Sequence, residues 1–125
     1  MKKILLIDDD EIFLKTVNDS LRAKDYEVIT AKDGREGLQI TKKERPDLIL
    51  LDVLMPDIGG MEFLKIIKAN KELNKIPVLI VSNFTGMNYV EEGIRLGAHG
   101  YIIKSEESLK TITDTIESII GNTTT

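Results

Sequence analysis

Four acidic residues follow directly on an apolar run near the start of the chain, in the segment "ILLIDDDEIFL" (4–14). Like charges this close repel one another unless a proton or a cation neutralises them. Mg²⁺ prefers oxygen ligands and is held by one or two carboxylates together with waters and phosphate oxygens. Asp8 and Asp9 are therefore candidate metal ligands. Asp10 and Glu11 fall in the first turn of the next predicted helix, where negative charge complements the helix dipole.

Three further polar residues end later apolar runs. Asp52 follows "LILL", Ser82 ends "VLIVS", and Lys104 follows "GYII". If these runs are strands of one parallel sheet, their carboxyl ends meet at one edge, where open α/β sheets bind ligands. Taken alone, each residue has a plainer explanation as a helix cap, a strand-end hydroxyl or a solvated lysine. Their common position at strand ends favours a shared site instead.

The elements that must position these residues are visible in the apolar pattern. Short apolar runs predict strands at 4–7, 28–31, 48–51, 78–81 and 101–103, and amphipathic segments after each run predict five helices. This alternation is typical of an α/β fold with a parallel sheet. The runs at 4–7, 48–51 and 78–81 are apolar almost throughout, as central strands are, whereas 28–31 is mixed and fits an edge. Gly97 is expected to end the fourth helix.

Composition limits the function. The chain has 125 residues, a net charge of -4, one histidine and no cysteine. We expect one domain over residues 1–121 and a short flexible tail at 122–125. The absence of cysteine excludes disulfides and thiolate metal sites. The scattered basic residues argue against direct nucleic-acid binding, and no apolar run reaches membrane-spanning length. We therefore expect a cytoplasmic protein.

With these residues in place, the sequence resembles the receiver domain of two-component response regulators, and it is chemotaxis-regulator-like. The segments "LLIDDDE", "LILLDVLMPD", "VLIVS" and "GAHGYIIK" carry the resemblance in order along nearly the whole chain. The resemblance implies a doubly wound, flavodoxin-like fold: a five-stranded parallel sheet of order 2-1-3-4-5 flanked by five helices.

The resemblance also implies a phosphorylation site. Asp52 corresponds to the phospho-acceptor, whose carboxylate attacks phosphorus to give an aspartyl phosphate. Asp9, Asp52 and the backbone carbonyl of Leu54 would bind Mg²⁺ directly, and Asp8 would hold a metal-bound water. Lys104 would pair with phosphoryl oxygens.

Ser82 and Tyr101 correspond to the switch residues. The Ser82 hydroxyl would donate a hydrogen bond to the phosphoryl group, and Tyr101 would move from an outward position into the space that Ser82 leaves. The surface built by the fourth helix, the strand at 101–103 and the helix at 109–120 would then repack. Such a change is a bistable element biased by a local charge.

The implied function is a phosphorylation-activated signalling switch in a phosphorelay. The donor would be a sensor histidine kinase or a phosphotransfer protein. The output would be an unknown downstream protein or a missing output domain, with a phosphorylation-dependent homodimer as one outcome. The protein would catalyse its own phosphorylation and slow dephosphorylation. Leu54 and Phe84 flank the expected path of the hydrolytic water, which predicts a long-lived phosphoryl group.

Some positions depart from the family pattern, and two other functions stay open. Ser105 stands where proline is common and is a candidate cap for the last helix, and Asn83 stands where a small residue is usual. Both departures would fit a pseudo-receiver that binds partners without phosphorylation. The spacing of Asp8 and Asp10 also resembles the nucleophile motif of haloacid-dehalogenase-type phosphatases, in which Asp8 would be the nucleophile.

Overall fold

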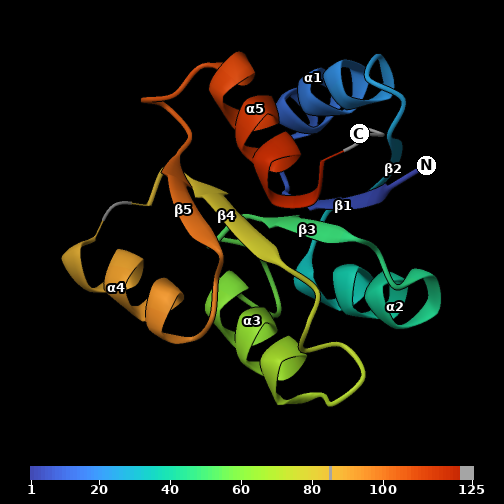
Figure 1. Cartoon of the computed structure of the whole chain (residues 1–125). Helices are drawn as coiled ribbons and strands as arrows, with labels where there is room; N and C mark the ends of the chain where they lie inside the picture. The colour runs from blue at the N-terminus through green and yellow to red at the C-terminus, as the bar shows by residue number, and fades with distance from the viewer. Residues whose placement is uncertain (85, 122–125) are drawn as a thin grey trace.

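The computed structural model describes residues 1–84 and 86–121, so the predicted tail at 122–125 lies outside the described residues. Within these described residues, five strands alternate with five helices (Figure 1). In order they are β1 Lys3–Ile7, α1 Glu11–Arg22, β2 Glu27–Ala31, α2 Gly34–Glu44, β3 Leu48–Leu51, α3 Gly60–Ala69, β4 Val78–Ser82, α4 Met87–Arg95, β5 Gly100–Ile103 and α5 Leu109–Ile120. Each strand predicted from an apolar run is present.

The sheet is parallel throughout, with strand order β2-β1-β3-β4-β5. This confirms the doubly wound topology and places the mixed strand β2 at an edge. Helices α1 and α5 cover one face of the sheet, and α2, α3 and α4 cover the other (Figure 1). Among the described residues, no helix is long and apolar enough to cross a lipid bilayer.

The two-sided core explains why the central strands are apolar throughout. In β1, Ile4 and Leu6 pack into the cluster beneath α1 and α5, whereas Leu5 and Ile7 pack into the cluster beneath α2 and α3. Successive side chains of a strand point to opposite faces, so a strand covered on both sides must be apolar at every position. All four residues are fully buried.

Strand register brings the polar strand ends together. Ile7 is opposite Leu51 in the pairing of β1 with β3, so the residues that follow them, Asp8 and Asp52, lie side by side. The backbone N–H of Asp52 donates to the carbonyl of Ile7 at 3.0 Å, and the N–H of Lys104 donates to that of Ser82 at 2.9 Å. Backbone pairing therefore fixes the backbone positions of four predicted site residues, namely Asp8, Asp52, Ser82 and Lys104.

Helix termini agree in part with the sequence. Asp10 caps α1, and its carboxylate accepts from the N–H groups of Ile12 and Phe13. Gly97 has a φ of 105° and follows the last residues of α4, as predicted. The predicted cap of α5 was wrong, because Ser108 and not Ser105 caps this helix, accepting from the N–H of Thr111.

Candidate functional site

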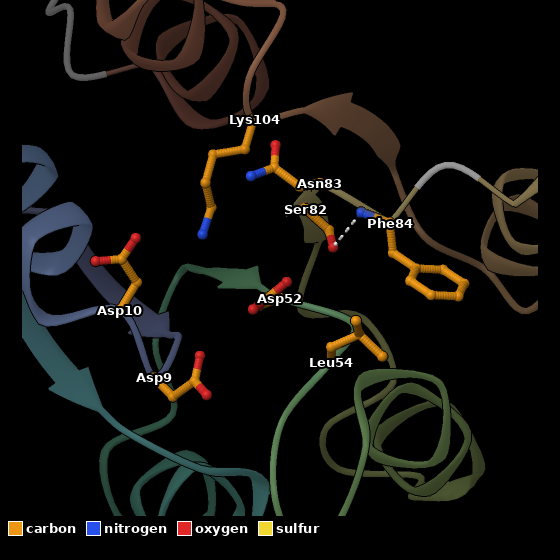
Figure 2. Close-up of a pocket in the computed structure, with 8 residues that line it drawn as sticks. All are labelled: Asp9, Asp10, Asp52, Leu54, Ser82, Asn83, Phe84 and Lys104. Carbon is orange, nitrogen blue, oxygen red and sulfur yellow. Dashed lines mark hydrogen bonds between the residues drawn. The ribbon is translucent and has the colours of Figure 1, made fainter.

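A cavity of about 350 Å³ opens at the carboxyl end of the sheet. It lies at the side of the molecule where the loops after β1, β3, β4 and β5 meet (Figure 2). Its lining is polar after β1 and β5, and the apolar side chains in it, Leu54 and Phe84, follow β3 and β4. The lining residues are Asp9, Asp10, Asp52, Leu54, Ser82, Asn83, Phe84 and Lys104.

Three carboxylates from two strand ends form the acidic part of the site. Asp8, Asp9 and Asp52 each offer an oxygen, and these oxygens all lie within 4.8 Å of one another. Asp8 is fully buried, Asp52 is 7% exposed, and Asp9 is exposed. Such a set of hard oxygen donors fits a divalent cation such as Mg²⁺ and leaves one face of the cluster open to the cavity.

Asp8 is held by two hydrogen bonds. Its Oδ2 accepts from the Lys104 ammonium at 2.8 Å, and its Oδ1 accepts from the backbone N–H of Asp10 at 2.9 Å. Burial raises the pKa of the Asp8 carboxyl above its ordinary value, while the two hydrogen bonds act in the opposite direction and the nearby Asp52 charge raises the pKa further. Burial has the largest effect on this pKa, and it acts by disfavouring the charged form of the carboxyl.

Asp52 is anchored on one side only. Its Oδ1 accepts from the backbone N–H of Val53 at 2.8 Å, and its other carboxylate oxygen has no hydrogen-bond partner among residues 1–84 and 86–121. Gly60, the first residue of α3, lets this helix approach closely, since a Cβ there would collide with the backbone of Asp52 and Val53. A carboxylate that is fixed but has one free oxygen is suited to nucleophilic attack.

Lys104 extends from the end of β5 into the cavity (Figure 2). Its side chain is only 15% exposed, and its ammonium lies 4.3 Å from the centre of the Phe13 ring. The ring is a favourable neighbour for a cation. The ion pair with Asp8 and the aromatic contact together hold the ammonium beside the acidic cluster.

Ser82 and Tyr101 meet at the loop after β4. Ser82 is buried, and its Oγ accepts from the N–H of Phe84 at 3.1 Å, which leaves its own O–H to donate elsewhere (Figure 2). The expected outward position of Tyr101 was wrong. This residue is half-buried, and its hydroxyl donates to the Phe84 carbonyl at 2.5 Å. Burial raises the pKa of the Tyr101 phenol, with the nearby Ser82 hydroxyl acting in the opposite direction.

The structure brings together Asp8, Asp9, Asp52, Ser82 and Lys104, as their strand-end positions predict. Leu54 also lines the cavity, with a side chain that is 56% exposed.

Sequence reasoning missed two residues of the site. Asp10 was assigned to the dipole of the first helix and to the alternative phosphatase motif, yet it also lines the cavity. Phe13 resembled an ordinary core residue of that helix, and no signal in the sequence indicates that its ring contacts Lys104.

The two departures from the family pattern also meet here. The backbone N–H of Ser105 donates to Oδ1 of Asn83 at 2.6 Å. The peptide bond between Lys104 and Ser105 is trans, since the described part of the chain contains no cis bond.

Comparison with known proteins relates this architecture to one family. Residues 4–117 match the model of the response regulator receiver domain. The polar-differentiation response regulator DivK of Brucella anthropi is 36% identical over 121 residues, which cover 97% of this chain and 98% of the relative.

Solved structures agree. The chemotaxis protein CheY4 of Vibrio cholerae superposes with a TM-score of 0.86 at 34% identity, covering 96% of this chain and 99% of that one. The Mn²⁺-bound response regulator Rcp1 gives a TM-score of 0.88 at 30% identity, covering 100% and 98%. The chain therefore belongs to the response regulator receiver domain family.

Proposed function

We propose that Asp52 is the phospho-acceptor of this phosphorylation-activated switch. The observation that carries the proposal is the state of its carboxylate. One oxygen accepts from Val53 N–H, the other has no hydrogen-bond partner in the described part of the chain, and Asp52 lines the same cavity as Lys104 and Ser82. A nucleophile positioned beside an ammonium and a hydroxyl has what phosphoryl transfer requires, namely orientation and charge stabilisation.

The transfer step follows from these positions. The free oxygen of Asp52 attacks the phosphorus of a phosphohistidine on a sensor histidine kinase or a phosphotransfer protein. The P–N bond breaks as the P–O bond forms, and the electron pair leaves with the imidazole, which takes up a proton. Lys104 pairs with the phosphoryl oxygens, and the Ser82 hydroxyl donates a hydrogen bond to one of them.

Asp8, Asp9, Asp52 and the backbone carbonyl of Leu54 would hold the Mg²⁺ ion directly or through water. Their fit rests on the three carboxylates that offer oxygens within 4.8 Å of one another. The ion supplies positive charge to the phosphoryl oxygens. The relative Rcp1 was crystallised with Mn²⁺ bound, which supports a divalent cation site in this chain.

The switch would run from Ser82 to the surface of α4, β5 and α5. When a phosphoryl group draws the Ser82 hydroxyl toward Asp52, the loop that carries Phe84 shifts with it, because Ser82 accepts from Phe84 N–H. Tyr101 is bonded to the carbonyl of the same Phe84 and would follow the loop. Phosphorylation would thus repack this surface for a downstream protein, an output domain or a second copy of the chain.

The extent of the domain and its location in the cell belong to the same proposal. Residues 1–121 would act as one receiver domain in the cytoplasm, with no direct contact to nucleic acid or membrane.

The phosphatase alternative finds no support at Asp8. This residue is fully buried, and both of its oxygens accept hydrogen bonds. The pseudo-receiver alternative is disfavoured by the complete set of acids, serine and lysine around the cavity.

The intact mass of the protein after incubation with acetyl phosphate, with and without Mg²⁺, tests the proposal. We expect one Mg²⁺-dependent phosphoryl adduct in the wild type and in an Asp19→Asn control, and none in Asp52→Asn. An adduct that survives Asp52→Asn but is lost in Asp8→Asn would refute it. A wild type that stays unmodified with both acetyl phosphate and a phosphorylated histidine kinase would favour the pseudo-receiver.

A further inference from the structure

Asn83 and Ser105 form a contact between two loops at the rim of the cavity. Asn83 directly follows Ser82, Ser105 directly follows Lys104, and the N–H of Ser105 donates to Asn83 Oδ1 at 2.6 Å. The hydrogen bond therefore joins the residues that come after the two proposed phosphoryl ligands. A proline in place of Ser105 has no N–H and would abolish this bond.

The same hydrogen bond fixes the orientation of the Asn83 amide. Because a backbone N–H needs an acceptor, the oxygen of the amide must face Ser105, and the NH₂ group must point the other way. Figure 2 shows the Asn83 nitrogen turned toward the side of the cavity into which Lys104 extends. This NH₂ group has no acceptor among residues 1–84 and 86–121.

We propose that the Asn83 side chain is an additional hydrogen-bond donor to the phosphoryl group on Asp52, and that the Ser105 N–H is its positioning group. The inference rests on the proposed function of Asp52. A donor that is oriented before the phosphoryl group arrives needs no reorganisation to bind it, which makes such a donor effective. Asn83 would thus join Lys104 and Ser82 as the third side-chain donor of the site.

The affinity for beryllium fluoride, a non-covalent phosphoryl analogue, tests the inference in the presence of Mg²⁺. Asn83→Ala removes the donor, and we expect its Kd to rise about tenfold, the value of one hydrogen bond to a charged group. Asn83→Asp keeps the oxygen that faces Ser105 but replaces the donor with negative charge, so its Kd should rise further. If the contact with Ser105 alone mattered, Asn83→Ala and Ser105→Pro would raise the Kd equally, because both remove that hydrogen bond.

Two variants of Ser105 separate orientation from contact. Ser105→Pro removes the N–H and leaves Asn83 in place, so we expect a Kd between those of the wild type and Asn83→Ala. Ser105→Ala keeps the N–H and should restore the affinity that Ser105→Pro loses. Asn74→Ala, which removes an exposed asparagine far from the cavity, is the matched control. Thermal unfolding of each variant verifies that it is folded.

The Asn83 side-chain amide signal in ¹⁵N-resolved NMR gives a second readout. Its loss in Asn83→Ala assigns it, and we expect it to shift when beryllium fluoride and Mg²⁺ are added to the wild type. An unmoved signal, or an Asn83→Ala variant with wild-type affinity, would overturn the inference while Asp52 remained the acceptor. If the wild type bound no beryllium fluoride and formed no adduct on Asp52, the proposed function and this inference would both fall.

Discussion

Replacing Asp52 with asparagine should stabilise the metal-free protein. Asp8 and Asp52 are both buried, and their oxygens lie no more than 4.8 Å apart. Two unit charges at that separation repel by about 3.5 kcal/mol at an effective dielectric constant of about 20. Lys104 neutralises part of this at Asp8. We therefore expect the free energy of unfolding of Asp52→Asn to exceed that of the wild type by about 1–3 kcal/mol.

Urea unfolding at neutral pH with EDTA measures this gain. Asparagine keeps the oxygen that accepts from Val53 N–H, so the substitution removes charge without removing that hydrogen bond. Asp19→Asn is the matched control, because Asp19 is exposed and forms a surface ion pair with Lys15, and its effect should stay within about 1 kcal/mol.

Mg²⁺ should offset most or all of the stability difference between the two proteins. A cation that binds only the folded state stabilises it by about 2.7 kcal/mol at a concentration of one hundred times its Kd. We expect the wild type to gain such stability on addition of Mg²⁺ and Asp52→Asn to gain little. If Asp52→Asn were no more stable than the wild type in EDTA, or gained equally from Mg²⁺, the repulsion argument would be refuted.

Other perturbations test separate parts of the account. Burial raises the pKa of Asp8, so the folded state holds this proton more tightly than the unfolded chain. The contribution of this proton to the free energy of unfolding is fully present at pH values below the pKa of Asp8 in the unfolded chain. It is lost as pH rises through the higher pKa of Asp8 in the folded protein. In EDTA, the wild type should thus lose stability relative to Asp8→Asn as pH rises from about 4 through the raised folded pKa of Asp8, measured by urea unfolding; a constant difference would contradict this. Gly60→Ala should lower the free energy of unfolding by about 1–3 kcal/mol, since its Cβ meets backbone atoms. Gly59→Ala, whose Cβ would meet its nearest atom at 3.7 Å, is the control and should change little. Tyr101→Phe should cost about 1 kcal/mol in the same assay, because the Phe84 carbonyl loses its donor. Leu54→Asn should speed loss of the phosphoryl adduct, followed by intact mass, because it places a polar group where an apolar side chain lines the cavity; unchanged decay would count against that role.

The fold was predictable because each strand has a distinct pattern. Ile4–Ile7 and Leu48–Leu51 are apolar at every position, which only strands covered on both faces require. The parallel arrangement then follows from the alternation of strands with helices. It also predicts that Asp8, Asp52 and Lys104 leave the sheet at the same edge, as they do.

The details that sequence reasoning missed depend on side-chain geometry within loops. Ser105 and Ser108 are both serines before the last helix, and only the path of the loop decides which of them caps it. The orientation of Tyr101 depends on where the Phe84 carbonyl lies. The bond between Asn83 and Ser105 joins positions 22 residues apart whose types alone predict no contact.

The chemical identity of the phosphorylated residue tests the central claim most directly. Sodium borohydride reduces an aspartyl phosphate to homoserine, and peptide mapping by tandem mass spectrometry then locates the modified position. After incubation with acetyl phosphate and Mg²⁺, we predict homoserine at position 52 and unmodified aspartates at positions 8 and 9. Homoserine at position 8, with Asp52 intact, would contradict the account.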